Sequence, residues 1–224
     1  MSEEVARLRT ALDSAVSVAA GPFIVHRGEL GGADVLLAEC GVGKVNAAAL
    51  TQLLIERGAR AVIFTGVAGA VDARLHVGDV VIGSDAVQHD VDVTGLGYEP
   101  GEVPGSGRTF ASDERLVDLA RAAAEDLGGV GVYVGRVASG DVFVSDPALS
   151  RSIAERFAAL CTEMEGAACA QVCCGWQVPF VIVRSISDGA DAGAHGDFRA
   201  FTKLAAANAE GIVRGVVRRL ASQE

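Results

Sequence analysis

The apolar segment Phe180–Val183 runs directly into a group of polar residues, and this pattern constrains the fold more than any other in the chain. Arg184, Ser187, Asp188 and Asp191 follow it closely. A strand that is apolar along its whole length is typical of a parallel sheet buried on both faces. In open α/β sheets, ligands bind beyond the carboxyl ends of the strands. The segment therefore predicts an α/β fold with a site at the exit of this strand.

Strand-like apolar segments alternate with helical segments rich in Ala and Leu along the chain. Strands are expected at Val35–Ala38, Ala61–Thr65, Val77–Val87 and Val130–Ser139, and helices at Val45–Arg57, Ser112–Leu127, Pro147–Ala159 and Phe198–Leu220. A further helix is expected to open at Ser2, and Ser112 is expected to cap the helix that it begins. This alternation predicts a largely parallel or mixed sheet covered by helices on both faces. A chain of 224 residues fits a single domain over residues 1–224.

The composition argues against several classes of protein. A net charge of −10 disfavours binding to nucleic acid or to an anionic membrane surface. It leaves a small neutral or cationic ligand compatible with the chain. No segment has the pattern of a signal peptide or the apolar length of a membrane span, so a cytoplasmic protein is expected.

The five cysteines include no Cys-x-x-Cys pair. Cys169 and Cys173 are four residues apart on an expected helix, which is a spacing that two metal ligands could use. No His stands at ligand spacing beside them, so we expect buried free thiols that act as small apolar side chains. Neither a metal nor a cofactor is expected.

Two glycine-rich segments follow expected strands. Gly41–Lys44 lacks the P-loop pattern because Ala38 and Val45 stand where that pattern needs Gly and Ser or Thr, and Asn46 removes the dinucleotide-binding pattern. The remaining interpretations are a tight turn that approaches a ligand closely, or simply a tight turn. Thr65–Gly69 is a second glycine-rich segment after the next expected strand, and its glycines would permit the backbone to approach a ligand closely.

Taken together, an ordered set of motifs is far more specific than any single one. The set comprises Gly41-Val42-Gly43-Lys44-Val45, Thr65-Gly66-Val67-Ala68-Gly69, Val77-Gly78-Asp79, His89-Asp90-x-Asp92-Val93-Thr94, Gly97-Tyr98, Ser139-Gly140-Asp141-x-Phe143, Glu163-Met164-Glu165 and Ser187-Asp188-x-x-Asp191. From Met1 to about Phe201, the chain resembles the 5′-methylthioadenosine/S-adenosylhomocysteine nucleosidases of the purine nucleoside phosphorylase-like superfamily.

The resemblance implies a fold and an activity. The fold would be a three-layer α/β/α arrangement around a central mixed, largely parallel twisted sheet. The short first strand of the family, which ends just before the position of Met1, would be absent. The activity would be hydrolysis of the N-glycosidic bond of 5′-substituted adenosines, carried out by a cofactor-free homodimer.

The resemblance also implies residue roles. Asp188 would be the general acid that protonates adenine at nitrogen-7, Glu4 would position and activate the attacking water, and Glu165 would bind the ribose hydroxyls. The other assignments are Met164 against the sugar face, Arg184 near the water, Ser187 among the substrate-binding residues, Phe143 stacking on the base, Val144 reading its edge through the backbone, and Val42, Leu96, Tyr98, Pro104 and Phe198 lining the 5′-alkylthio pocket. Some of these residues would cross from the partner subunit.

The chemistry is consistent with two carboxyl groups in opposite states. Adenine leaves more readily when it is protonated, while the attacking water needs a base, as in glycoside hydrolysis. Burial of Asp188 favours its protonated form, and the first turn of a helix favours the ionised form of Glu4. From the sequence without the resemblance, Glu4 would be interpreted as a surface residue of a first helical turn.

Three alternatives stay open from the sequence. Nucleoside phosphorylases of this fold carry a phosphate-binding Arg where this chain has Phe64, so water is the preferred nucleophile. A hydrolase acting on futalosine-type nucleosides would share the acid and the water chemistry. A nucleoside-binding protein without catalytic activity is the third alternative.

Overall fold

The structure, a computed structural model, describes residues 2–190 and 194–222, and the side chains of residues 194–200 and 202–203 lie outside this description. The elements follow in the order α1 (Ser2–Thr10), β1 (Asp13–Ala20), β2 (Phe23–Leu30), β3 (Ala33–Ala38), α2 (Lys44–Glu56), β4 (Val62–Ala70), β5 (Val80–Gln88), the 3-10 helix η1 (Thr94–Leu96), β6 (Thr109–Ala111), α3 (Glu114–Glu125), β7 (Val132–Ser139), α4 (Pro147–Phe157), β8 (Ala159–Glu163), α5 (Gly166–Trp176), β9 (Phe180–Asp188) and α6 (Ala194–Ala221).

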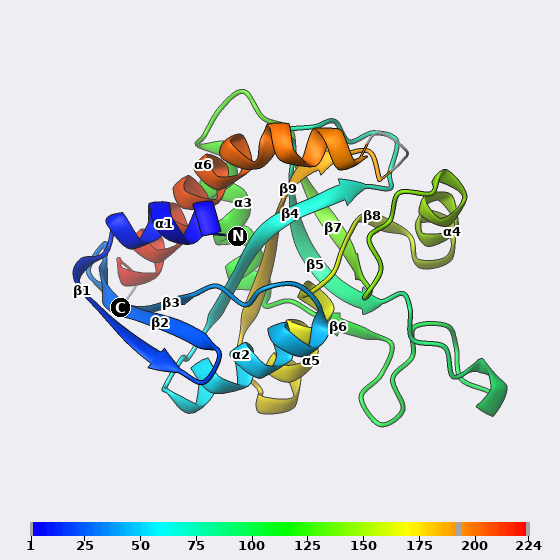
Figure 1. Ribbon diagram of the computed structural model, residues 1–224, viewed down its shortest axis with the longest axis horizontal. Helices are drawn as coiled ribbons and strands as arrows, with labels where there is room; N and C mark the ends of the chain where they lie inside the picture. Colours follow the sequence, from blue (N-terminus) through cyan, green and yellow to red (C-terminus); the bar gives the residue numbers. More distant parts are fainter. Residues whose placement is uncertain (1, 191–193, 223–224) are drawn as a thin grey trace.

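Five strands close into a barrel at the centre of the molecule (Figure 1). Their order is β5-β7-β8-β4-β9, and β9 pairs again with β5. The pairs β4–β9, β5–β7 and β7–β8 are parallel, whereas β4–β8 and β5–β9 are antiparallel. β6 extends the sheet from β5. The predicted mixed α/β sheet is confirmed, but its closure into a barrel was not predicted.

Helices cover the barrel on two sides. α3 packs with α6 on one side, and α2 packs with α5 on the other (Figure 1). Along β9, Val181 and Val183 pack with the residues of α3 and α6, while Phe180 and Ile182 pack with those of α5. Because successive side chains of a strand point to opposite faces, a strand covered on both faces is apolar throughout. The expectation for this segment is confirmed.

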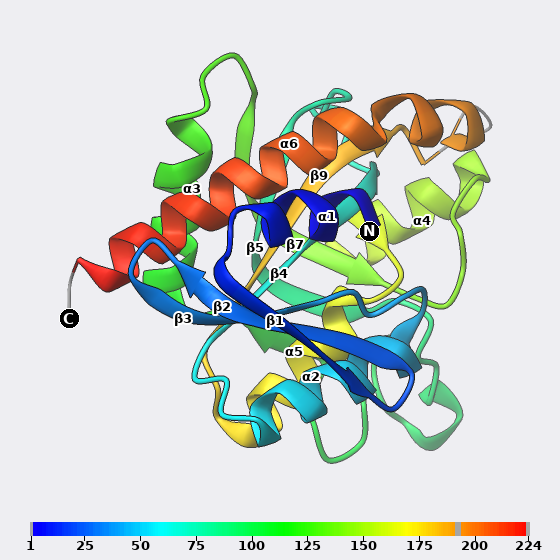
Figure 2. The ribbon, with the colours of Figure 1, turned by 60° about the vertical axis from the view of Figure 1, so that its left-hand side comes forward.

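A second, three-stranded antiparallel sheet, β1-β2-β3, follows α1 and lies beside the barrel (Figure 2). Its last strand matches the predicted strand, whereas β1 and β2 were not predicted. Leu8, Leu12 and Leu30 cluster with Val213 and Val217, so α6 supports this sheet and α1 as well as the barrel. α1 is thereby held in place by apolar packing.

Two local predictions are corrected. Asp113, not Ser112, caps α3, because its carboxylate accepts a hydrogen bond of 2.9 Å from the amide of Leu116. The strand expected at Ala61–Thr65 continues to Ala70, so Gly66 and Gly69 lie within β4 instead of in a turn. This extension carries β4 into the region of the predicted site.

Candidate active site

The ends of four barrel strands meet where the sequence predicted a site. Asp188 of β9 pairs in register with Gly69 of β4, and Gly69 pairs with Thr162 of β8. Ser139, the last residue of β7, pairs with Glu163, the last residue of β8. Side chains that are distant in the sequence are therefore brought together at one end of the barrel.

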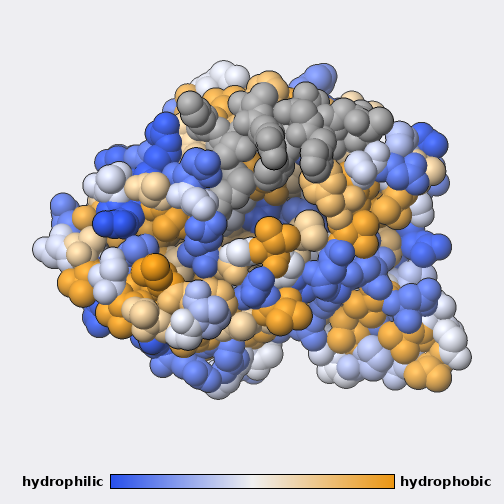
Figure 3. All heavy atoms as spheres, in the orientation of Figure 1, coloured by the Kyte–Doolittle hydropathy of each residue, from blue (hydrophilic) through white to orange (hydrophobic). Residues whose placement is uncertain are grey.

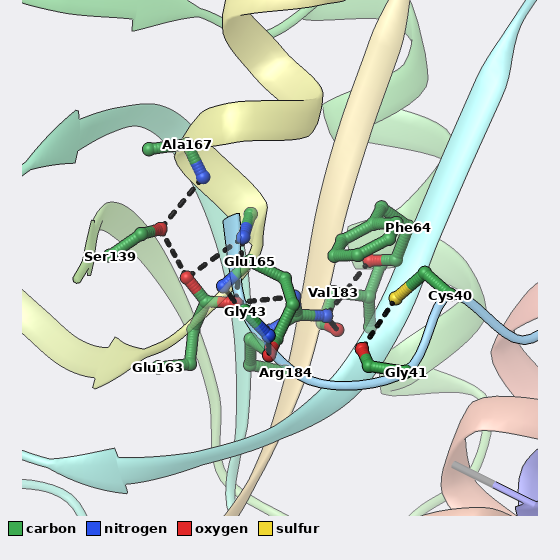
Figure 4. Close-up of polar contacts among 11 residues, drawn as sticks. Cys40, Gly41, Gly43, Phe64, Ser139, Glu163, Glu165, Ala167, Val183 and Arg184 are labelled. Carbon is green, nitrogen blue, oxygen red and sulfur yellow. Dashed lines mark hydrogen bonds and ion pairs between the residues drawn. The ribbon is translucent and has the colours of Figure 1, made fainter. Parts of the chain in front are cut away.

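Glu163 and Arg184 form a buried ion pair at this end (Figure 4). The Nη2 atom of Arg184 lies 2.6 Å from Oε2 of Glu163, and their side chains are 1% and 3% exposed. The same carboxylate accepts hydrogen bonds from the amide of Gly166, at 2.8 Å, and from the hydroxyl of Ser139. Both oxygens of the Glu163 side chain are therefore held by donors. The sequence motif contained Glu163, but no role was predicted for it.

Arg184 is held on every side of its guanidinium group. Its Nη1 atom donates to the carbonyls of Phe64 and Val183, at 3.3 and 3.2 Å, and its Cζ atom lies 4.7 Å from the centre of the Phe64 ring. A Cβ atom at Gly66 would come within 2.9 Å of Nη1, so only glycine leaves space for the guanidinium group against β4. Burial lowers the pKa of Arg184, but attraction to Glu163, Glu165 and Glu4 outweighs it and raises the pKa above its ordinary value.

Glu165 is half-buried at the start of α5 and faces the start of α2 (Figure 4). Its Oε1 atom accepts a hydrogen bond of 2.7 Å from the amide of Gly43. Burial, followed by repulsion from Glu163, raises its pKa, while the Gly43 amide and Arg184 act in the opposite direction. The turn at Gly41–Lys44 is therefore tight, with positive φ at Gly41 and Gly43, and it contacts a predicted ribose-binding carboxylate.

Asp188 is 3% exposed at the end of β9. Its Oδ2 atom accepts a hydrogen bond of 2.7 Å from the hydroxyl of Ser187, and its Oδ1 atom accepts one of 2.9 Å from the amide of Ala190. A Cβ atom at Gly69 would come within 2.7 Å of Oδ1. Gly66 and Gly69 of β4 thus share one function, which is to admit a buried polar side chain of β9.

Glu4 lies in the first turn of α1 and is 1% exposed. Its carboxylate contributes to raising the pKa of Arg184, which places it in the same electrostatic environment as Glu163 and Glu165. The interpretation of Glu4 as a surface residue is wrong. Packing of α1 against α6 and β3 holds it at the predicted site.

The apolar residues assigned to the substrate pocket are mostly exposed in the single chain. Val144 is buried, but Val42, Leu96, Tyr98, Pro104 and Phe143 are exposed. Leu96 and Tyr98 belong to the β5–β6 loop, which projects away from the barrel at the lower right of Figures 1 and 3 and carries apolar side chains on its surface. Met164 is half-buried beside Glu165. The side chain of Phe198, and Asp191, lie outside the described residues.

Cys161, Cys169 and Cys173 are buried in the apolar cluster between α5 and the barrel, as expected for small apolar side chains. Among the side chains that the structure describes, which exclude those of residues 194–200 and 202–203, no group of three or more His, Cys, Asp or Glu residues is placed to hold a metal ion. Within the described residues, no helix combines the length and the apolar character needed to cross a membrane.

Comparison with known proteins identifies the family. The chain matches the Phosphorylase superfamily over residues 1–218. It is 42% identical to a 5′-methylthioadenosine/S-adenosylhomocysteine nucleosidase of Geobacillus sp. (strain WCH70), over 98% of this chain and 96% of that protein. The chain belongs to this nucleosidase family.

Solved structures support the same assignment. The nucleosidase of Neisseria meningitidis, in complex with methylthio-immucillin-A, superposes with a TM-score of 0.94 at 42% identity, covering 98% of this chain and 96% of that chain. Futalosine hydrolase of Helicobacter pylori strain 26695 superposes with a TM-score of 0.92 at 30% identity, covering 98% and 94% of the two chains. The predicted fold family is confirmed, including the expectation of a nucleoside phosphorylase-like fold.

Proposed function

We propose that this protein hydrolyses the N-glycosidic bond of 5′-methylthioadenosine and S-adenosylhomocysteine, releasing adenine and a 5-thioribose product. The observation that carries the proposal is the burial of Glu4 and Asp188 at the same end of the barrel as the Glu163–Arg184 pair. Burying a carboxyl group costs free energy, so two buried carboxyl groups close to a buried ion pair indicate a functional site. The proposed reaction needs a general acid and a water-activating base on opposite sides of a bond that breaks through an oxocarbenium-like state, and these two carboxyl groups would fill those roles.

The proposed roles follow from the contacts at the site. Asp188 protonates adenine as it leaves, with Ser187 and Ala190 fixing its carboxyl group. Glu4 activates the water. Glu165 accepts hydrogen bonds from the ribose hydroxyls, because its carboxylate is half-buried and positioned by the Gly43 amide. Phe143 and Val144 bind the base.

Hydrolysis is favoured over phosphorolysis by the state of Arg184. A phosphate ion needs a cation whose donors are available for pairing. The guanidinium group of Arg184 already donates to Glu163, Phe64 and Val183. The neighbouring carboxylates would in addition repel a phosphate ion. Water, which is neutral, fits this environment better.

A futalosine-type nucleoside is the second candidate substrate. The specific support for it is the likeness to futalosine hydrolase, whose chain superposes nearly as well as the nucleosidases do. Both reactions would use the same acid and the same water. The two candidates therefore differ only in what occupies the 5′ pocket.

We further propose that the protein acts as a homodimer in the cytoplasm. Val42, Leu96 and Tyr98 are assigned to the 5′ pocket, and they are exposed apolar side chains in the single chain. Exposed apolar residues around a binding site are typical of an interface. A second copy that covers them would complete the pocket.

The experiment is to measure release of the free purine base from 5′-methylthioadenosine, S-adenosylhomocysteine and a futalosine-type nucleoside, each with and without phosphate. Phosphate-independent release from the first two supports the proposal. Release that requires phosphate would identify a phosphorylase, and preferred cleavage of the futalosine-type substrate would favour the second candidate. The absence of all release would contradict the proposal.

A further inference from the structure

The start of α2 is capped by carboxylates from two other parts of the chain. Gly43, at the N-cap position, has φ 96° and no side chain to offer. Instead, the Gly43 amide donates to Glu165, and the amide of Lys44 donates to Oδ1 of Asp141 at 2.8 Å. A helix N-terminus carries unsatisfied amides and a partial positive charge, so it holds both carboxylates firmly. One helix end therefore contacts both the ribose-binding residue and the loop that carries Phe143.

The side chain of Lys44 completes a closed ring of hydrogen bonds that joins Lys44, Asp90 and Asp141. Its Nζ atom lies 2.7 Å from Oδ1 of Asp90 and 3.0 Å from Oε1 of Gln88. The other oxygen of Asp90 accepts a hydrogen bond of 2.9 Å from the amide of Asp141. Asp141 is thus held twice, through its carboxylate by the Lys44 amide and through its own amide by Asp90.

The Lys44–Asp90 pair is partly shielded from water, whereas Asp141 is exposed. The side chains of Lys44 and Asp90 are 17% and 23% exposed, so their pairing is less screened than that of a typical surface pair. Burial raises the pKa of Asp90, but the hydrogen bonds from Lys44 and Asp141 outweigh burial and leave the pKa below its ordinary value. Asp90 is therefore ionised at neutral pH.

Further contacts fix the loop at its N-terminal end, directly before Asp141. The amide of Gly140 donates to the carbonyl of Glu163 at 3.1 Å, and the amide of His89 donates to the carbonyl of Ser139 at 2.9 Å. A Cβ atom at Gly140 would collide with the ring of His89. Phe143 and Val144 follow Asp141 closely in the sequence, so the position of Asp141 determines where they begin.

We propose that Lys44, Asp90 and Asp141 form a clamp that fixes the base-binding loop, residues 140–144, relative to the ribose-binding carboxylate of Glu165. The three are positioning residues, and the proposal rests on the nucleosidase function proposed above. The glycosidic bond joins the two halves of the substrate that these elements hold. A small error in their relative position lowers the rate because the acid and the water lose their alignment with that bond.

The test compares the whole substrate with one half of it. Lys44→Met and Asp90→Ala are each expected to lower kcat/KM for 5′-methylthioadenosine by roughly 10- to 100-fold. Adenine alone would contact the base-binding loop and Asp188 but not the ribose-binding carboxylate of Glu165, so its inhibition constant is expected to change by no more than about threefold. Lys44→Arg, which keeps the cation, is expected to recover most of the rate.

A double variant and a remote control sharpen the test. Lys44→Met combined with Asp90→Ala is expected to lose no more activity than either single variant, because both break the same ring. Arg121→Met removes an exposed i,i+3 pair with Asp118 on α3 and is expected to leave activity unchanged. Equal losses in adenine affinity and in kcat/KM would overturn the clamp, as would unchanged kcat/KM in both single variants.

A second measurement does not depend on activity. In Lys44→Met, faster amide exchange of Asp141, measured by NMR, is expected because the ring that protects this amide opens. Unchanged exchange at Asp141 would contradict the clamp even if the wild-type protein cleaved none of the nucleosides. Faster exchange at Asp141 in Lys44→Met together with an inactive wild-type protein would instead count against the proposed function alone.

Discussion

The two halves of the candidate site differ in how completely one chain builds them. The polar half, with Glu4, Glu163, Arg184 and Asp188, is buried, and the contacts of its ion pair lie within a single barrel end. The apolar half, represented by Leu96, is open to solvent and belongs partly to a projecting loop. The barrel therefore preorganises the groups that are proposed to break the bond, whereas the surface that is proposed to bind the 5′ group would need a cover from a second copy.

This difference has a physical reason. Charged groups must be desolvated and paired to act as strong, fixed dipoles, and the rigid ends of adjacent strands achieve this. An apolar pocket needs only complementary area, which a loop and a second subunit can provide on assembly. Variants in the first half should therefore change rate and stability, and variants in the second should change substrate affinity.

The largest effect is expected for Asp188→Asn. The amide keeps the shape of the side chain but has no acidic proton to give to adenine, so kcat is expected to fall by roughly 10²- to 10⁴-fold. Steady-state adenine release measures this effect, and circular dichroism checks that the variant is folded. Activity close to that of the wild type would remove Asp188 from the proposed mechanism.

A large effect on stability is expected for Glu163→Gln. The variant leaves the buried charge of Arg184 uncompensated and is expected to lower the free energy of unfolding by about 3–5 kcal/mol, measured by urea denaturation. Glu210→Gln is the matched control, because Glu210 pairs with Arg7 and Arg214, whose side chains are 48% and 58% exposed. The control is expected to lose about 1 kcal/mol or less, and equal losses in the two variants would show that burial of the Glu163 pair is unimportant.

A pH-dependent effect is expected for Glu165→Gln. The pKa of Glu165 is raised in the folded protein above the ordinary value of 4.5, so its ionisation opposes folding. Below the unfolded-state pKa, wild type and variant are expected to be equally affected by pH. As pH rises from the unfolded-state pKa through the raised folded-state pKa, the wild type loses the stability that protonated Glu165 contributes. The variant, which has no ionisable group at this position, does not lose it.

Urea denaturation at acidic and neutral pH measures that difference. The stability of Glu165→Gln relative to the wild type is expected to increase between the two conditions, while its activity is lower at both. A constant difference in stability across the range would be evidence against a raised pKa at Glu165.

The smallest effect is expected for Leu96→Ala. If a second subunit covers Leu96 beside the 5′ group, KM for 5′-methylthioadenosine is expected to rise by roughly tenfold with kcat almost unchanged. Val134→Ala, at a position 44% exposed on β7, is the control and is expected to leave KM unchanged. A fall in kcat with unchanged KM would show that Leu96 acts with the polar half of the site and not with the apolar half.

The sequence predicted those helices and strands that can be identified from the pattern of their own residues. The apolar run before Arg184 identified β9 and the location of the site, because burial on both faces leaves no polar position in the strand. The helices were predicted to within a few residues, and the cap of α3 was misplaced by one. β1 was missed because all of its residues but the last are exposed, and its only apolar alternation, Val16-Ser17-Val18, is too short to indicate a strand.

The remaining features depend on contacts between distant residues. Pairing of β5 with β9 closes the barrel. Neither strand's own sequence predicts that the two strands pair or that they run antiparallel. Gly66 and Gly69 are visible as glycines, but the guanidinium and carboxyl groups that require them arrive from β9. Glu4 was placed at the site through the family resemblance, since its local sequence is that of an exposed first turn.

Closure of the barrel by β9 also determines when the protein acquires its chemistry. During synthesis β4 and β5 are made long before β9, and the parallel pairing of β4 with β9 joins segments that are far apart in sequence. Such non-local pairings form late and slowly. Because β9 carries Arg184 and Asp188, the pairing that closes the barrel also brings the proposed acid to the site.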